Sequence, residues 1–292
     1  MANEMVNKRT FRQKLASYKK KPFSLICLIL VSLSALITAL LVLSLVAYIL
    51  VKGIPHLNRG LFAWNYTTEN SSMMPAIINT VIMTVMSLLI AGPIGIFSAI
   101  YMTEYAKKGN KLVGIVRTTT ETLAGIPSIV YGLFGQLLFV LACGFDYSML
   151  AGALTLSIMV LPTIMRTTEE ALLSVPDAYR EGSFGLGAGR LRTVFRIVLP
   201  SAIPGILAGV ILSVGRIVGE TAALIYTAGT VAGIPESLLR SGRTLSVHMY
   251  ALLNEGLYME QAYATAVILL IMVALINALS TFISRKITAK GG

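Results

Sequence analysis

Long apolar stretches alternate with short polar and basic stretches along the whole chain. A membrane-spanning helix needs about 20 predominantly apolar residues, because each residue advances the helix by about 1.5 Å. The pattern therefore predicts an all-α integral membrane protein with six transmembrane helices. The predicted spans cover residues 23–51, 75–101, 118–141, 147–165, 201–226 and 263–284.

Two of these spans contain helix-breaking residues. The second holds Gly92-Pro93, and the third holds the stretch AGIPSIVYGLFG with Gly125, Pro127 and Ser128. Irregular backbone is tolerated at membrane depth only where protein covers it or where it lines a water-filled cavity. We therefore expect Gly125, Pro127 and Ser128 to line a pathway. Outside the spans, residues 245–253 predict a short helix at the membrane surface.

Composition supports a membrane protein and excludes an ordinary soluble domain. The chain has 292 residues, of which 55% are hydrophobic and 13% charged, whereas soluble domains carry about 25% charged residues. The net charge of +11 would suit a nucleic-acid partner, but the basic residues cluster at the ends of apolar stretches. Cys27 and Cys143 lie far apart and indicate neither a disulfide framework nor a metal site. No metal, cofactor or catalytic residue is predicted.

The basic residues predict the orientation. Nineteen of the 24 Lys and Arg residues fall on one side of the six predicted spans, four fall on the other, and Arg216 lies within a span. Because cytoplasmic loops carry the excess of Lys and Arg, both termini are predicted to be cytoplasmic. Residues 1–22 form a basic cytoplasmic tail in this reading. Residues 23–51 form a retained transmembrane helix, since the apolar stretch is too long for a cleaved signal peptide.

Ionisable residues within the apolar stretches need an explanation, because a charge at the centre of a spanning helix costs about 2.5–3.5 kcal/mol. Arg216 and Glu220 are four residues apart, which predicts an ion pair on one helix face. This pair either holds helices together or forms an anion site on a permeation pathway, with the Arg216 guanidinium as the planar donor. In the second case Glu220 orients Arg216 or accepts a proton from the substrate, which would favour hydrogen phosphate over sulfate. Glu121 is predicted to be interfacial and solvated.

Small residues on the predicted fifth span predict close helix packing. Gly205 and Gly209, and again Gly215 and Gly219, have the spacing that lets helices approach each other.

The stretch EGSFGLGAGRLRTVFRIVLP at residues 181–200 is short, basic and rich in glycine. It predicts a short cytoplasmic helix from Asp177, a break at residues 187–189, and a new helix that enters the membrane near Pro200. Ser174 and Asp177 have the spacing of a capping box. One interpretation is an ordinary basic cytoplasmic loop.

The same stretch resembles the coupling loop of ABC importer permeases, whose pattern is Glu-Ala-Ala, three residues, Gly, nine residues, Ile-x-Leu-Pro. Gly and Ser replace the two alanines here, and the spacing is intact. The resemblance implies that the loop, within residues 166–200, docks on a cytoplasmic ATPase subunit. The residues it assigns to ATPase coupling are Glu181, Gly182, Ser183, Gly187, Ile197, Leu199 and Pro200.

Two further stretches, residues 124–135 and GRIVGETAALIYTAG at residues 215–229, make residues 70–285 similar to the PstA-type permeases of phosphate importers. PstC permeases carry a similar signature, and the short first outer loop and the chain length favour PstA. The resemblance implies the type I (MetI-like) ABC importer fold in a prokaryotic plasma membrane, with phosphate as substrate. It implies as partners a second, PstC-like permease, two PstB-like ATPase subunits and an extracytoplasmic PstS-like phosphate-binding protein.

The chain itself has no Gly-x4-Gly-Lys-Ser/Thr phosphate loop, so ATP hydrolysis is assigned to a separate subunit and the chain is not an enzyme. An ABC permease for another oxyanion or small solute fits the residues as an alternative. A secondary anion transporter fits them less well, because it needs no ATPase-docking segment. An intramembrane serine hydrolase would need a base near Ser183, and both histidines, His56 and His248, fall in outer loops.

Overall fold

The computed structural model describes residues 22–107, 109–256 and 258–290, and every regular element in that part of the chain is helical. Three of the elements are π-helical turns that continue a neighbouring α-helix. The elements are α2 (Pro22–Gly53), η1 (Ile54–His56), η2 (Arg59–Phe62), α3 (Met74–Ile100), η3 (Tyr101–Tyr105), α4 (Lys111–Ala124), α5 (Ser128–Gly135), η4 (Gln136–Ala142), α6 (Met149–Leu173), α7 (Asp177–Gly185), α8 (Arg190–Thr193), η5 (Val194–Val198), α9 (Leu199–Val218), α10 (Ala222–Ile225), α11 (Leu245–Glu255) and α12 (Met259–Lys290).

The chain divides into two units, residues 1–51 and 52–292. In the first unit, α2 carries no charged residue before Lys52 and exposes most of its apolar side chains. The predicted basic tail, apart from Pro22, lies outside the described residues.

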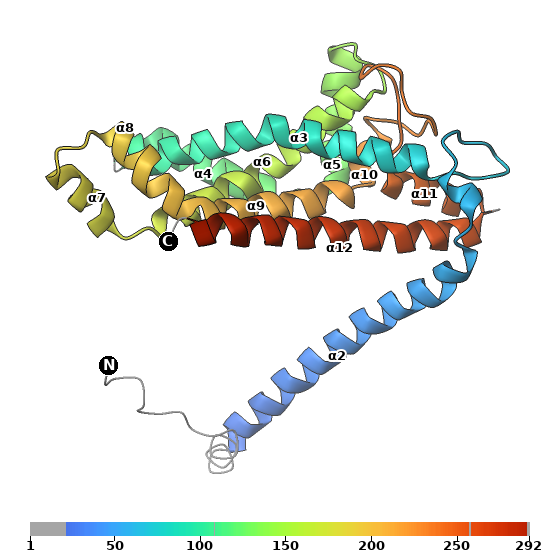
Figure 1. The fold of residues 1–292 in the computed structure, drawn as a ribbon, viewed down its shortest axis with the longest axis horizontal. Coiled ribbons are helices and arrows are strands. Elements are labelled where there is room, and N and C mark those ends of the chain that lie inside the picture. The colour runs from blue at the N-terminus through green and yellow to red at the C-terminus, as the bar shows by residue number, and fades with distance from the viewer. Residues whose placement is uncertain (1–21, 108, 257, 291–292) are drawn as a thin grey trace. The chain divides into compact units, whose positions relative to one another are not determined.

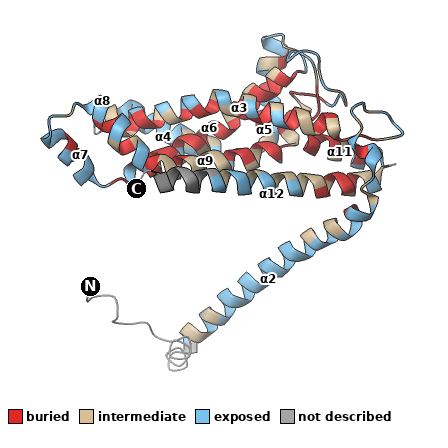
Figure 2. Ribbon diagram, in the orientation of Figure 1, coloured by how far each residue is buried: buried red, intermediate tan, exposed pale blue. Residues whose placement is uncertain are grey.

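The second unit is a bundle in which α3, α6, α9 and α12 run side by side (Figure 1). Helix α6 is the centre of the bundle, because it packs against α3, α4, α5 and α9 and is largely buried (Figure 2). Two apolar clusters hold the bundle together along its length. One surrounds Met83, Leu156 and Met159, and the other joins Leu172 to Val198 near the end that carries α7.

Small residues set the contact between α9 and α6. A Cβ atom on Gly205 would lie 2.6 Å from the Ala171 Cβ atom, and one on Gly209 would overlap Thr167. The close approach predicted from Gly205 and Gly209 is therefore confirmed. Gly215 has open space instead, so the second glycine pair makes no tight contact within the described residues.

The predicted all-helical membrane fold is confirmed. Five described helices are long and apolar enough to cross a membrane, and a sixth span arises if α4 and the α5–η4 helix count as one. The irregular backbone predicted within the third span, residues 118–141, is present, but the span begins earlier than predicted. Its helix begins at Lys111, and the axis turns by 107° between Ala124 and Ser128. The break has a local cause, since the residue before Pro127 is disfavoured in the helical conformation.

Helix α11 forms where a short helix was expected. Leu245, Val247 and Leu252 are fully buried, whereas Tyr250 and Leu253 are exposed. Part of the surface of α11 therefore packs inside the bundle and part of it is exposed.

Candidate functional site

The basic loop at one end of the bundle folds as two short helices joined by a tight turn. Helix α7 begins at Asp177, as predicted, and the chain reverses at Gly187, whose φ of +81° is left-handed and favours glycine. The following helix begins at Arg190, directly after the break predicted at residues 187–189. A π-helical turn over Val194–Val198 ends two residues before Pro200, and such turns accommodate a residue that lacks a backbone N–H.

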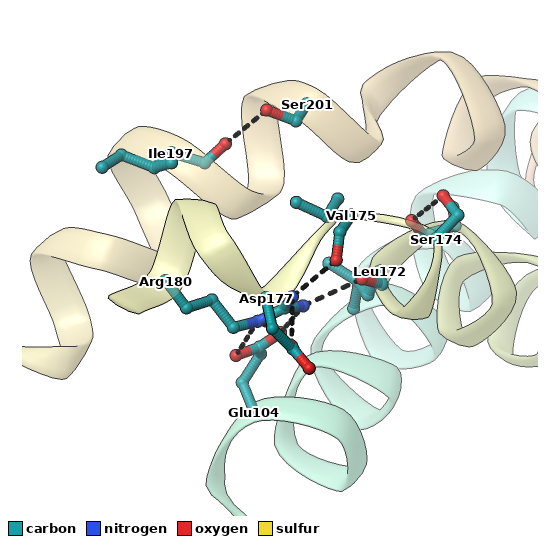
Figure 3. Close-up of polar contacts among 9 residues, drawn as sticks. Glu104, Leu172, Ser174, Val175, Asp177, Arg180, Ile197 and Ser201 are labelled. Atoms are coloured by element: carbon teal, nitrogen blue, oxygen red, sulfur yellow. Dashed lines mark hydrogen bonds and ion pairs between the residues drawn. The ribbon is translucent and has the colours of Figure 1, made fainter. Parts of the chain in front are cut away.

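The polar residues of the segment have separate tasks. Ser183 is buried, and its hydroxyl hydrogen-bonds the Thr193 hydroxyl at 2.8 Å, which ties α7 to α8. Glu181 and Gly182 are exposed. Ser174 does not cap α7 as its spacing predicted, because its hydroxyl donates to the Ala171 carbonyl and Pro176 occupies the capping position (Figure 3).

Further along the segment, Ile197 and Leu199 are half-buried and Pro200 is exposed. The Ile197 carbonyl accepts a hydrogen bond from the Ser201 hydroxyl at 2.8 Å (Figure 3). This part of the motif therefore belongs to the start of the long helix that enters the bundle.

Large apolar side chains remain exposed on this segment. Leu186 is 91% exposed, and Tyr179, Phe184 and Leu191 are also exposed. Exposed apolar side chains gathered on a surface mark contacts with another protein or with the membrane.

Arg180 is a residue of this site that the sequence did not single out. Its Nη2 atom lies 2.7 Å from Glu104 Oε1, and it also donates to the Leu172 carbonyl at 2.9 Å. Its Nη1 atom donates to the Val175 carbonyl at 2.7 Å and to Asp177 Oδ1 at 3.2 Å (Figure 3). The hydrogen bond with Glu104 raises the pKa of Arg180, so the guanidinium stays charged.

The predicted ion pair between Arg216 and Glu220 is not formed. Helix α9 ends at Val218, so Glu220 no longer lies one turn above Arg216 on the same helix. The Glu220 carboxylate accepts instead from the Ala223 backbone N–H at 3.0 Å and caps α10. The Ser246 hydroxyl donates to the Glu220 backbone carbonyl at 2.6 Å, which fixes α11 beside this cap.

Arg216 is half-buried and makes no ion pair within the described residues. It lies within electrostatic range of Tyr131, whose hydroxyl donates to the Leu123 carbonyl at 2.7 Å across the α4–α5 break. Tyr131, which was not predicted as a site residue, therefore contacts the α4–α5 break and lies near Arg216. A guanidinium without a carboxylate partner is free to bind an anion.

The predicted pathway residues lie at this same break. Gly125 ends α4, Pro127 precedes the first residue of α5, and Ser128 begins α5. Gly125 and Pro127 are exposed and Ser128 is half-buried. The structure thus brings these three residues to the α4–α5 bend that Tyr131 spans.

A cavity of about 240 Å³ lies between α4 and α6, and its lining is rich in charged residues. Arg117 pairs with Glu169 across it, and Arg166 pairs with Glu170 at 3.0 Å. Glu121, predicted to be solvated, is exposed and lines this cavity.

A buried polar cluster at the other end of the bundle was not predicted from the sequence. Arg243 is 4% exposed and lies 4.6 Å from the centre of the Tyr66 ring, and His248 is fully buried against the edge of that ring. Burial, and then the Arg243 charge, lower the pKa of His248 to about 3, which a backbone contact with Ser71 opposes only weakly. The histidine is therefore neutral in the folded chain.

Acid should destabilise the fold through His248. The unfolded imidazole binds a proton near pH 6.5, whereas the folded one does so only near 3. The stability this group contributes is complete above pH 6.5, and it falls by about 1.4 kcal/mol per pH unit as the pH drops towards 3. Thermal unfolding of the purified chain in detergent between pH 7.5 and 4.5 measures this loss. His248→Gln should flatten the profile, whereas His56→Gln, which changes a partly exposed histidine, should not. Equal slopes for His248→Gln and the unchanged chain would contradict the assignment.

Residues 91–289 match the family described as binding-protein-dependent transport system inner membrane component. The chain is 35% identical to the probable ABC transporter permease protein YqgI of Bacillus subtilis, over 88% of this chain and 94% of that one. It is 34% identical to the phosphate transport system permease protein PstA of Pasteurella multocida, over 78% and 82% of the two chains. It is 35% identical to the corresponding protein PstA 1 of Mycobacterium tuberculosis, over 71% and 69%.

Solved structures share the fold at lower identity. A bacterial ABC transporter involved in the import of the acidic polysaccharide alginate superposes with a TM-score of 0.67 at 18% identity, over 94% of this chain and 99% of that one. The MetNI methionine ABC transporter in an inward-facing conformation superposes with a TM-score of 0.58 at 22% identity, over 73% and 93%.

Proposed function

The chain belongs to the binding-protein-dependent transport system inner membrane components, the permease subunits of ABC importers, and we propose that it is the PstA-type permease of an inorganic phosphate importer. The similarity to PstA permeases over up to 78% of the chain is the observation that carries this proposal. The half-buried, unpaired guanidinium of Arg216 supports it, because a planar cation suits an oxyanion.

The proposed assembly has three kinds of partner. A second, PstC-like permease completes the pathway, one of two cytoplasmic ATPase subunits docks on the α7 segment of this chain, and an extracytoplasmic protein delivers phosphate. The exposed apolar side chains of the α7 segment support the docking site. The distribution of Lys and Arg supports cytoplasmic termini in a prokaryotic plasma membrane.

Within this assembly we assign Arg216 to the substrate pathway and the break at Gly125, Pro127 and Ser128 to its lining. Glu181 and Gly182 face the ATPase, since both are exposed on α7. Ser183 and Gly187 shape the docking segment, and Ile197, Leu199 and Pro200 join it to α9.

Reconstitution tests the proposal. The chain is assembled with its three kinds of partner in proteoliposomes, and ATP-driven uptake of phosphate, sulfate and molybdate is compared. We expect phosphate to be taken up and the other two oxyanions to be excluded. Uptake of sulfate or molybdate in preference to phosphate would assign the permease to another oxyanion, and uptake without ATP would contradict the ABC mechanism.

The Glu220→Gln variant distinguishes the role of Glu220 as a helix cap from its proposed role as a proton acceptor. The glutamine side-chain oxygen can still accept from the Ala223 N–H, so the cap on α10 is kept, while the carboxylate that would accept a proton from hydrogen phosphate is lost. We expect phosphate uptake to fall about tenfold, which corresponds to the loss of about 1.4 kcal/mol from one weakened interaction. The preference for phosphate over sulfate should also decrease. Unchanged phosphate uptake with unchanged sulfate exclusion would remove Glu220 from the substrate pathway.

A further inference from the structure

Two contacts between side chains attach the docking helix α7 to the rest of the described chain. One is the buried bond between Ser183 and Thr193, which leads into α8 and on to α9. The other is the ion pair between Arg180 and Glu104, which reaches a residue 76 positions earlier in the chain. The first contact joins neighbours in sequence, whereas the second connects α7 to the end of a different spanning helix.

The ion pair between Arg180 and Glu104 is mostly buried, and several hydrogen bonds fix its geometry. The Arg180 side chain is 15% exposed and the Glu104 side chain 8%. Arg180 Nε and Nη2 both donate to the Glu104 carboxylate, while Nη1 and Nη2 also donate to the Val175 and Leu172 carbonyls at the end of α6 (Figure 3). One guanidinium therefore holds α7 against the ends of two spanning helices. Multiple bonds in a planar fork fix orientation as well as distance.

Glu104 has a special position on α3. It lies in the π-helical turn Tyr101–Tyr105 that directly extends α3. Such turns within helices often occur at functional sites, because the extra residue redirects side chains. Since Met102 in the same turn is buried, the turn is anchored in the bundle, and force on the Glu104 carboxylate is delivered to α3 itself.

From this geometry we propose that Arg180 and Glu104 form the joint that carries movement of α7 to α3, so that both α3 and α9 follow the ATPase. The inference rests on the proposed function in one respect, namely that α7 contacts the ATPase. Arg180 is then a positioning residue, because it acts through α3 and not on the substrate. Movement delivered to two helices of the bundle can open or close a pathway between them, whereas movement of α9 alone would leave α3 behind.

The test measures solute imported per ATP hydrolysed by the reconstituted complex. Glu104→Gln removes the charge and keeps the shape of the side chain. We expect ATP hydrolysis to stay within about twofold of wild type and import per ATP to fall about tenfold. Arg180→Gln should have a similar effect, and the double variant should be no worse than either single variant, since all three break one interaction.

Glu260→Gln is the matched control. It removes the carboxylate of another ion pair, with His56, but the Glu260 side chain is 69% exposed and lies outside α7, so import per ATP should be unchanged. If Glu104→Gln lowers thermal stability yet imports as much per ATP as wild type, the pair only holds the fold together and the inference is overturned. Should Glu104→Gln fail to assemble, Glu104→Asp keeps the charge with a shorter reach. A partial fall in import per ATP is then expected, and a wild-type ratio would overturn the inference.

A second readout does not depend on the transported solute. Cys27 and Cys143, both exposed, are first changed to serine. Spin labels are then attached to cysteines that replace Phe97 on α3 and Leu212 on α9, which are also exposed. ATP should change the distance between the labels in the labelled complex, and Glu104→Gln should reduce that change. If the ATP-driven change in the distance between the labels is as large in Glu104→Gln as in wild type, the inference is overturned. Failure of the wild-type complex to import phosphate would count against the proposed substrate alone.

Discussion

Arg216→Gln is expected to lower ATP-driven phosphate uptake by about 10- to 100-fold. A hydrogen bond to a charged group contributes about 1.5–3 kcal/mol, and each 1.4 kcal/mol is a factor of ten. Glutamine keeps a donor but loses the charge and the planar fork that match an oxyanion. Because Arg216 makes no ion pair within the described residues, its replacement leaves no carboxylate without a partner in this part of the chain. The measurement is the initial rate of uptake in proteoliposomes at equal amounts of assembled complex.

Two further variants make this prediction specific. Arg216→Lys keeps the charge without the fork and should give an intermediate rate. Arg240→Gln removes an exposed arginine from the loop between α10 and α11 and should leave uptake unchanged. Equal uptake by wild type and Arg216→Gln would show that the guanidinium does not meet the substrate. A loss of assembled complex in Arg216→Gln, with normal uptake by the fraction that assembles, would assign Arg216 to helix packing.

The sequence predicted the helices well wherever a long apolar stretch met no competing signal. The spans that became α3, α6 and α12 follow from apolar length alone. In the third span, Gly125 and Pro127 predicted irregular backbone, but they did not predict the angle of 107° between the two helices. Apolar length reports that a segment prefers the membrane, but it carries no information about the direction of the helix axis.

The Arg216–Glu220 pair failed for a related reason. The four-residue spacing places both side chains on one face only if the helix continues, and α9 ends at Val218. Gly219 marks this end, since glycine commonly follows the last residue of a helix. That signal stood in the sequence, but it competed with an apolar run that continues to residue 226. The length of a continuous apolar segment therefore predicts the position of a helix end poorly.

The docking segment shows both the reach and the limit of sequence reasoning. The helix from Asp177 and the turn at Gly187 are local features, and the order of residues predicted both. The partner of Arg180 could not be predicted in this way, because Glu104 lies in a different helix and only the folded bundle brings the two together. Arg243 and His248 were likewise assigned to an outer loop, since nothing local indicates that they are buried.

Glu181→Lys is expected to leave the chain in the membrane and to uncouple ATP hydrolysis from uptake. Glu181 is exposed on α7, so a lysine can be accommodated without disturbing the contacts of Ser183 or Arg180. Reversing a charge at a docking surface replaces attraction with repulsion, which costs several kcal/mol where the charges are close.

We expect phosphate uptake to fall at least tenfold, while ATP hydrolysis by the ATPase subunits continues or the subunits no longer co-purify with the permease. The measurements are uptake, ATP hydrolysis and co-purification on the same reconstituted complex. Glu236→Lys, an equal charge reversal on an exposed residue between α10 and α11, should change none of them. Coupled uptake at the wild-type rate by Glu181→Lys would show that this face of α7 does not meet the ATPase. The exposed apolar side chains of the segment would then have to serve a different partner.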